Sequence, residues 1–256
     1  LGPGNPYVRL GVAGPMARTV DDAALLFGVL ARPDRRDPAC RGLAVPARID
    51  PADRPVRVAW SDDLGGLPVE RDVTAALHGL RARIERLGWT VVDAEPDFAG
   101  ADECFETIRS WDVANGPISR LGDRTAEVKA TVRDELARGR CLDQQQVAAA
   151  IAHLAVLWRR AVAFFDEVDL LVGPVTQLSP FPVEWEYPTE VAGVTMDRYL
   201  TWMRSCSRIT ALQLPAMSLP AGTTDAGLPV GAQLIGSPRG DLELLRAAKA
   251  LEHAAA

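Results

Sequence analysis

The sequence lacks the features that mark several large classes of protein. Lys and Arg number 28 against 34 Asp and Glu, so the net charge of −6 gives no attraction to nucleic acid or to an acidic membrane. No apolar run approaches the roughly 18 residues that cross a membrane, and there is no secretory signal pattern. We therefore expect a cytoplasmic protein with neither a nucleic-acid nor a membrane partner.

Cysteine and histidine are also scarce. The cysteines have no Cys-x-x-Cys pair, and the histidines lack the spacing of metal ligands. They are Cys40, Cys104, Cys141 and Cys206, and His78, His153 and His253. The pattern predicts idle or buried thiols in a reducing compartment, with no metal and no other cofactor. We interpret His153 as a hydrogen-bonded residue of a long helix rather than as a catalytic group.

The groups that would carry hydrolytic or phosphate chemistry are missing as well. Lys129 lies in an Arg- and Glu-rich helix and Lys249 on the terminal helix; they are the only lysines, and no Gly/Ser-rich run occurs. No Gly-x-Ser-x-Gly elbow presents a serine, and no glycine-rich phosphate loop is present. Ser205, Ser207 and Ser218 are interpreted as structural groups, and the 62–66 loop as solvated. No catalytic residue is therefore predicted.

What the sequence does contain is a regular succession of strand-like and helical segments. Strands are expected at 8–16, 55–60, 90–94, 169–174, 216–219 and 228–235, the last two buried in the middle of a sheet. Helices are expected at 20–31, 73–87, 102–119 with a break at Gly116, 125–138, 144–165, from 199 onward, and 242–251. The strand–helix–strand unit at 55–94 predicts a parallel pair. The fold class is α/β, with a mixed β-sheet flanked by helices on both faces.

Local signals fix several helix ends. Thr19 is expected to be the N-cap of its helix, Asp143 and Gln146 to form a capping box, and Asp241 to cap the terminal helix. Gly88 is expected to end the second helix in a left-handed conformation. Gly231, inside a strand, predicts the close approach of another element.

Three stretches carry a resemblance. The first reads Pro-Ala-Met-Ser-Leu-Pro-Ala-Gly, then Gly-Leu-Pro-Val-Gly-Ala-Gln-Leu-Ile-Gly, then Gly-Asp and a helix, within 215–251. The second is Gly-Pro-Met-Ala-Arg-Thr-Val-Asp-Asp-Ala-Ala-Leu-Leu, at 14–26. The third is a long helix followed by an Asp-Leu-Leu strand and Pro-x-Thr, ending at Thr176. Together they resemble the C-terminal part of the amidase-signature fold.

The resemblance implies an enzyme that hydrolyses small carboxylic amides. In that family a lysine acts as a base through a bridging serine, a second serine attacks the carbonyl, and backbone N–H groups hold the oxyanion. Those residues precede the Gly-Pro-Met-Ala-Arg-Thr segment. Residues 1–256 are therefore expected to be the C-terminal portion of an amidase-signature domain, with the catalytic N-terminal portion outside the chain. Alone, the chain is expected to be inactive.

This portion is expected to supply walls of the substrate pocket. Thr176 and Gln177 follow a strand end and could offer polar groups to an amide, while Trp185 and Trp202 could supply apolar or stacking surface. Gln213 stands where members of the family often have Gly before the strand. The substrate preference of the family therefore does not transfer to this chain.

Two other functions stay open. One is a non-catalytic α/β binding or scaffold module derived from an amidase. The other is the A subunit of a tRNA-dependent amidotransferase, although the 185–203 region looks more like stand-alone amidases.

The chain also begins without Met. If its sheet is truncated, a strand edge and an apolar face lose their cover. We then expect it to bind the missing N-terminal half or to form a homodimer with a second copy.

Overall fold

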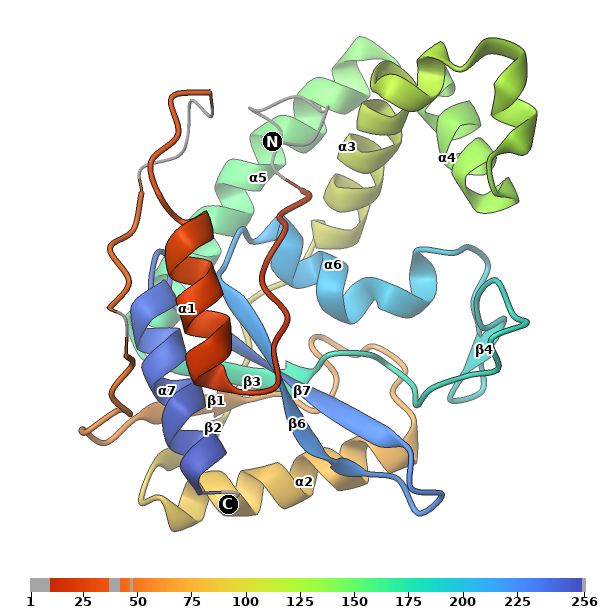
Figure 1. Cartoon of the computed structure of the whole chain (residues 1–256). Helices are drawn as coiled ribbons and strands as arrows, with labels where there is room; N and C mark the ends of the chain where they lie inside the picture. The colour runs from red at the N-terminus through yellow and green to blue at the C-terminus, as the bar shows by residue number, and fades with distance from the viewer. Residues whose placement is uncertain (1–9, 37–41, 47, 255–256) are drawn as a thin grey trace.

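The computed structural model describes residues 10–36, 42–46 and 48–254. Its main element is a five-stranded mixed sheet in the order β2-β1-β3-β7-β6 (Figure 1). The strands are β1 (Arg57–Trp60), β2 (Thr90–Asp93), β3 (Leu170–Pro174), β6 (Ala216–Thr223) and β7 (Pro229–Gly236). β1 pairs in parallel with β2 and β3, whereas β7 runs antiparallel to both β3 and β6. The predicted fold class is confirmed.

Helices cover both faces of this sheet. They are α1 (Val20–Leu30), α2 (Arg71–Arg86), α3 (Ala101–Asn115), α4 (Ala130–Cys141), α5 (Gln144–Phe165), α6 (Arg204–Ala211) and α7 (Asp241–His253). Short 3-10 turns lie at Pro117–Arg120, Gly122–Glu127 and Thr201–Met203, and the last of these is called η3. A small hairpin of β4 (Glu190–Val191) and β5 (Val194–Thr195) stands apart from the main sheet (Figure 1).

The alternation of side chains along the strands separates two cores. On one face, Val58 and Trp60 pack with buried residues of α2 and α7. On the other face, Ala59 packs with buried residues of α3, α5 and α6. Because successive side chains of a strand point to opposite faces, one apolar strand supplies both cores. This explains why the central strands read as continuous apolar runs.

Most of the helix caps predicted from the sequence are confirmed. Thr19 Oγ1 accepts a hydrogen bond from the Asp22 backbone N–H at 3.1 Å. The capping box is complete, because Asp143 Oδ1 accepts from Gln146 N at 2.7 Å and Gln146 Oε1 accepts from Asp143 N at 2.9 Å. Gly88 has φ of +77°, the left-handed conformation that a C-terminal glycine provides.

The strand expected at 8–16 is wrong over its described part. Residues 8 and 9 lie outside the described residues, and 10–16 contain no strand. Val12 and Met16 are 84% and 95% exposed. A strand needs a hydrogen-bonded neighbour, and the described residues offer none to this segment. The helix expected at 125–138 also begins later than predicted, because residues up to Glu127 form a 3-10 turn and α4 starts at Ala130.

Two expectations at the C-terminal end are corrected. β6 is an edge strand rather than a central one, and its residues are exposed or partly buried except for the buried Ala221. Asp241 is not the N-cap: it is the first residue of α7, Gly240 precedes it as the cap, and no side chain caps that end. Arg239, in the turn before α7, has φ of +64°. Gly231 does lie close to its neighbours, since an added Cβ would be 3.3 Å from Val175 Cγ2.

An uncovered edge and an apolar face are both present in the described residues. β6 pairs only with β7, so its other edge has no strand beside it. On α1, Leu25, Leu26, Val29 and Leu30 are between 43% and 58% exposed. These are the features expected where a second piece of protein would pack.

The long helix α5 is apolar enough to raise the question of a membrane. By length and composition alone it could cross one, and it is the one helix of the described residues that could. It carries Arg159 and Arg160, however, and its Leu157 and Ala161 side chains are fully buried in the core shared with α3. One side of the helix thus packs on the core, while most of its surface is not buried by the described residues.

Candidate functional site

The carboxyl ends of β1, β2 and β3 lie at one edge of the sheet, because the three strands are parallel. The chain leaves β1 toward α2 on one face and leaves β2 toward α3 on the other. Ligands of open α/β sheets bind where neighbouring connections diverge in this way. We therefore take this edge as the candidate site.

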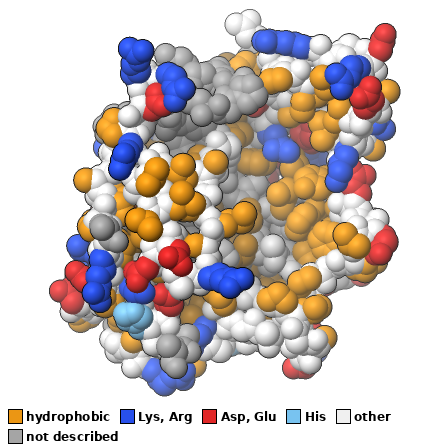
Figure 2. Space-filling view, viewed as in Figure 1, with side chains coloured by type: hydrophobic (Ala, Val, Ile, Leu, Met, Phe, Trp, Pro, Cys, Tyr) orange, Lys and Arg blue, Asp and Glu red, His pale blue; other side chains and the backbone are white. Residues whose placement is uncertain are grey.

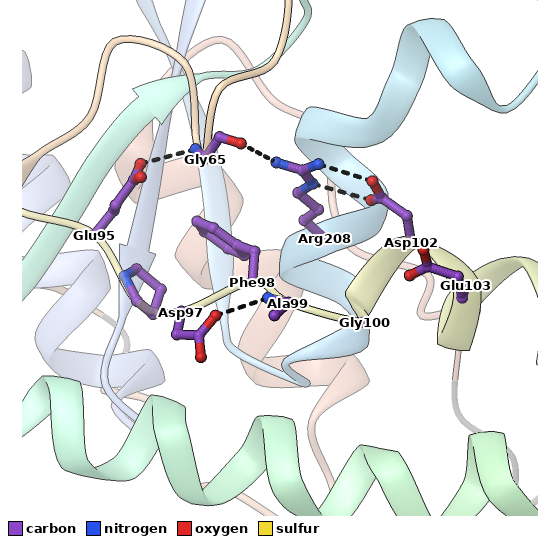
Figure 3. A pocket seen from close by; sticks show the side chains of 10 residues that line it. Gly65, Glu95, Asp97, Phe98, Ala99, Gly100, Asp102, Glu103 and Arg208 are labelled. Carbon is purple, nitrogen blue, oxygen red and sulfur yellow. Dashed lines mark hydrogen bonds and ion pairs between the residues drawn. The ribbon is translucent and has the colours of Figure 1, made fainter.

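A cavity of about 400 Å³ opens between the loops that follow β1 and β2 (Figure 3). Its lining is polar, apart from one phenyl ring and small residues. The members that carry a functional group or the ring are Glu95, Asp97, Phe98, Asp102, Glu103 and Arg208. Carboxylates dominate this lining, so the cavity favours neutral or cationic groups over anions.

The loop after β1 is held rigidly beside this cavity. Leu64, Gly65 and Gly66 have successive positive φ values of 48°, 92° and 76°. Ser61 Oγ donates to Glu95 Oε2 at 2.6 Å and accepts from Leu64 N at 2.8 Å. Gly65 N also donates to Glu95 Oε2, at 2.8 Å (Figure 3). A positive φ strains the backbone of Leu64, which is fully buried. These hydrogen bonds stabilise that strained conformation.

Arg208 joins that loop to two helices. Its Nη1 donates to the carbonyl oxygens of Leu64 and Gly65 at 2.7 and 2.9 Å. Its guanidinium also pairs with Asp102 and lies 5.7 Å from the centroid of the Phe98 ring. Because Nε, Nη1 and Nη2 all donate hydrogen bonds within the protein, Arg208 positions the loop and is not left free to bind an anion.

The two polar residues predicted for the pocket hold the loop after β3. Thr176 Oγ1 donates to the Leu178 carbonyl at 2.9 Å. Gln177 is fully buried, and its Nε2 donates to the Pro68 carbonyl at 3.1 Å, while its Oε1 has no partner among the described residues. The loop is also fixed by Ser179, whose N and Oγ donate to Glu70 Oε2 at 3.0 and 2.9 Å.

The two predicted tryptophans meet on a shared neighbour. Phe181 stacks with Trp185 at 6.3 Å between ring centroids and meets Trp202 edge-to-face at 5.5 Å. The structure thus brings Trp185 and Trp202 into one cluster, which lies in the segments between β3 and α6. Thr176 and Gln177 hold the same loop in place through hydrogen bonds to backbone carbonyl groups.

Neither lysine is placed to act as a base. Lys249 Nζ lies 2.9 Å from Asp21 Oδ2 and 3.0 Å from Glu252 Oε2. These two hydrogen bonds, that to Asp21 first, raise the pKa of Lys249, so it stays protonated. Lys129 is an exposed residue at the start of α4. Within the described residues, no hydrogen bond joins a lysine to a serine.

Ser205, Cys206 and Cys104 are structural as well, whereas Cys141 is exposed and Cys40 lies outside the described residues. Ser205 Oγ and Cys206 Sγ both donate to the Val175 carbonyl, at 2.8 and 3.0 Å. Burial raises the pKa of Cys206, and burial raises the pKa of the Cys104 thiol to about 11. His153 Nε2 lies 3.0 Å from the Ala99 carbonyl oxygen, which confirms a hydrogen-bonded helix histidine. Among the described residues no group of three His, Cys, Asp or Glu could hold a metal ion.

The ion pairs between α3 and α6 were missed by the sequence reasoning. Asp102 and Glu106 are four residues apart on α3, as are Arg204 and Arg208 on α6. Arg204 Nη2 lies 3.0 Å from Glu106 Oε1, and Arg198 also pairs with Glu106. The four-residue spacing places the two carboxylates on one face of α3 and the two guanidinium groups on one face of α6. This spacing is the signal that could have indicated that the two helices face each other.

Comparison with known families identifies the class to which this protein belongs. The family model described as Amidase matches residues 7–245. The chain therefore belongs to the amidase-signature family. This agrees with the three stretches that resemble that family.

Its curated relatives are about twice as long. An acylamidase of Rhodococcus erythropolis is 28% identical, over 93% of this chain and 51% of the relative. The A subunit of the glutamyl-tRNA(Gln) amidotransferase of Myxococcus xanthus is also 28% identical, over 93% of this chain and 54% of the relative. The chain thus spans about half the length of the curated relatives it matches.

Solved structures support the fold. A bacterial aryl acylamidase of the amidase-signature family superposes with a TM-score of 0.80 at 24% identity, covering 94% of this chain and 52% of that one. The 6-aminohexanoate cyclic dimer hydrolase superposes with a TM-score of 0.78 at 24% identity, covering 93% and 54%. At this identity the likeness establishes the shared α/β fold.

Proposed function

We propose that residues 1–256 are the C-terminal portion of an amide hydrolase that cleaves small carboxylic amides to acid and ammonia or amine in the cytoplasm. The catalytic Ser–Ser–Lys apparatus would lie in a polypeptide segment preceding Leu1. The observation that carries the proposal is that this chain aligns over almost its whole length with only about half of each amide-hydrolysing relative.

The surroundings of the two lysines support the placement of the catalytic residues outside this chain. A lysine base must lose its proton, and burial away from other charges is what lowers its pKa. Lys249 instead lies between two carboxylates, which keep it charged, and Lys129 is exposed. The chain alone should therefore be inactive, and no metal or cofactor is needed for the proposed reaction.

The missing half is also the partner that the surface favours. The free edge of β6 and the apolar side chains of α1 would be covered by an N-terminal portion that continues the sheet. Without it, a second copy of the chain would cover the same surfaces, and the isolated chain would run as a dimer in size-exclusion chromatography. A stable monomer would contradict this part of the proposal.

The test compares two polypeptides on simple amides such as acetamide and propionamide. One is the 256-residue chain, and the other extends to the start codon of its open reading frame. We expect ammonia release from the longer form, inhibited by a serine-directed fluorophosphonate and retained in its Lys249→Gln and Lys129→Gln variants. Turnover by the 256-residue chain itself, abolished by the same reagent, would overturn the proposal.

Two alternatives have their own discriminating observations. A start codon directly before Leu1 would favour a non-catalytic binding or scaffold module. Glutamine-dependent amidation of a charged tRNA by the longer form, together with its partner proteins, would favour the A subunit of an amidotransferase. That class is represented among the relatives.

A further inference from the structure

The chain contains only two asparagines, and they differ in the residue that follows. Asn115 precedes Gly116, whereas Asn5 precedes Pro6. The side-chain amide carbon of an asparagine can be attacked by the peptide nitrogen of the next residue. Glycine presents that nitrogen without a Cβ beside it, whereas the nitrogen of proline carries no hydrogen to lose. Asn115 is therefore the only asparagine of the chain that is placed for this reaction.

Asn115 lies where the chain leaves a helix. It is the last residue of α3, and Gly116 already has extended backbone angles, with φ of −87° and ψ of −167°. The carbonyl groups of a last helical turn have no intrahelical partners, and helix ends fray. The Asn115 side chain is also exposed, so that water and hydroxide reach it. The reacting peptide bond thus lies at an end of α3 that can open.

Little of the surrounding structure resists such opening. The buried residues of α3 end at Ser110, and the two 3-10 turns at Pro117–Arg120 and Gly122–Glu127 contain none. Figure 2 shows charged side chains on the upper part of the molecule, where Figure 1 places α4 beside the carboxyl end of α3. A segment with few buried contacts opens locally at a small cost in free energy. The end of α3 can therefore open while the core stays packed.

One hydrogen bond holds the Asn115 side chain in the folded state. Its Nδ2 donates to the Trp111 carbonyl oxygen at 2.8 Å. A single hydrogen bond of this kind shifts an equilibrium by about fivefold to tenfold. It therefore slows an attack on the amide carbon of Asn115 without preventing it.

We propose that Asn115 is a site of spontaneous deamidation. The Gly116 nitrogen loses its proton to hydroxide and attacks Asn115 Cγ, the bond from Cγ to Nδ2 breaks, and ammonia leaves with a proton from water. The product is a cyclic succinimide. Water then opens the ring at either carbonyl and leaves aspartate or isoaspartate at residue 115. In total one water molecule is consumed and one ammonia molecule is released, with no oxidant, reductant or enzyme.

The products loosen the end of α3. A carboxylate at residue 115 cannot donate to the Trp111 carbonyl, and its charge adds to that of Asp112 in a last turn that has no basic residue. The carboxyl end of a helix carries a partial negative charge, so a further negative charge there is unfavourable. Isoaspartate also lengthens the main chain by one carbon where the Pro117–Arg120 turn begins. The end of α3 therefore opens more readily as the protein ages.

The test follows each asparagine by peptide mapping. Trypsin cleaves after Arg109 and Arg120, so the peptide Ser110–Arg120 carries Asn115 as its only asparagine. The 256-residue chain and the longer form are incubated at mildly alkaline pH after circular dichroism has shown that they are folded. We expect mass spectrometry to show the loss of Asn115 in favour of aspartate and isoaspartate, while Asn5 remains. If Asn115 persists as long as Asn5, the proposal is overturned.

A synthetic peptide of residues 110–120 gives the rate of the reaction without a fold. We expect the folded chain to convert no more than about tenfold more slowly, because the helix end opens at a small cost. A larger slowing would show that α3 protects Asn115 and would contradict the proposal. The matched control is Asn115→Gln, which keeps a carboxamide but lengthens the side chain by one carbon, so that ring closure at Gly116 is disfavoured. The 110–120 peptide of this variant should stay unchanged.

A second variant, Asn115→Asp, tests the effect on the helix, because it carries the charge of the product from the start. Its Tm should be lower than that of the neutral Asn115→Gln, and the difference should shrink in high salt. Equal Tm values in the two variants would contradict the assigned effect on α3. None of these outcomes depends on amide hydrolysis by the protein, so the proposed function is tested separately.

Discussion

Arg208 on α6 and Asp102 on α3 form a two-pronged ion pair, with Nε 3.0 Å from Oδ1 and Nη2 2.8 Å from Oδ2. Their side chains are only 13% and 15% exposed. Two parallel hydrogen bonds match the planar guanidinium to the carboxylate, so the pair fixes direction as well as distance. Since Arg208 also holds the Leu64 and Gly65 carbonyls, this pair links α3, α6 and the loop after β1.

Asp102→Asn should therefore destabilise the fold by about 3 kcal/mol, because it leaves a largely buried guanidinium without its countercharge. Urea unfolding followed by circular dichroism measures the loss. The control is Glu127→Gln, which removes an exposed pair with Arg124 at 3.4 Å and should change stability by no more than about 0.5 kcal/mol. Equal losses in the two variants would show that the Asp102 pair is not a structural link.

The close contact between α3 and α4 requires a residue without a side chain at Gly139. A Cβ added at Gly139 would overlap the Ser110 carbonyl oxygen and lie 2.6 Å from Ala114 Cβ. Gly139→Ala should therefore cost about 2–3 kcal/mol by overpacking. Gly79→Ala on α2 meets nothing within 4 Å and should stabilise by about 0.5–1 kcal/mol through helix propensity. Thermal unfolding of both variants checks the opposite signs; a stable Gly139→Ala would mean that α4 can move away.

Gln213 offers a stabilising substitution. Its φ of +57° puts a side chain in the left-handed region just before β6. Gln213→Gly should raise the free energy of unfolding by about 0.5–1 kcal/mol, because only glycine adopts this conformation without a steric cost. Gln213→Ala keeps the Cβ and should bring no gain. If alanine stabilises as much as glycine, strain at this residue is not the cause.

The carboxyl group of Asp169 should contribute stability near neutral pH that is lost in acid. Burial raises its pKa, but hydrogen bonds from Arg54 at 2.7 Å and from the Arg57 N–H at 2.8 Å outweigh burial and lower the pKa below its usual value. A folded-state pKa below the unfolded value of about 3.9 gives stability that is present above that pH and is lost as pH falls through the folded pKa.

Asp169→Asn should thus flatten the fall in unfolding free energy on acidification from about pH 5 to pH 3. Arg54→Met, which removes only one donor, should give an intermediate slope. Urea unfolding at a series of pH values provides the measurement. A slope for Asp169→Asn equal to that of the parent would show that the hydrogen bonds do not favour the ionised form.

Much of the candidate site could not be read from neighbouring residues. Trp185 and Trp202 were predicted as pocket surface, but the contact of both with Phe181 required the loop after β3 to return beside η3. The cavity at the ends of β1 and β2 was missed. Its loop reads as solvated because Glu95, which fixes it, lies 30 residues further along the chain.

Local patterns in the chain were enough to predict most of the helices, the capping at Thr19 and Asp143, the parallel β1–β2 pair and the family. Such features depend on periodicity and on hydrogen bonds within a few residues, which a short stretch of sequence records. The helix expected from 199 onward starts only at Arg204, after the 3-10 turn η3. The position of β6 at an edge, the start of α7 at Asp241 and the pairing of Arg208 with Asp102 emerged only from the folded molecule. The edge position and the ion pair depend on which surfaces meet after the chain has folded, and Arg208 and Asp102 are separated by 106 residues in the sequence.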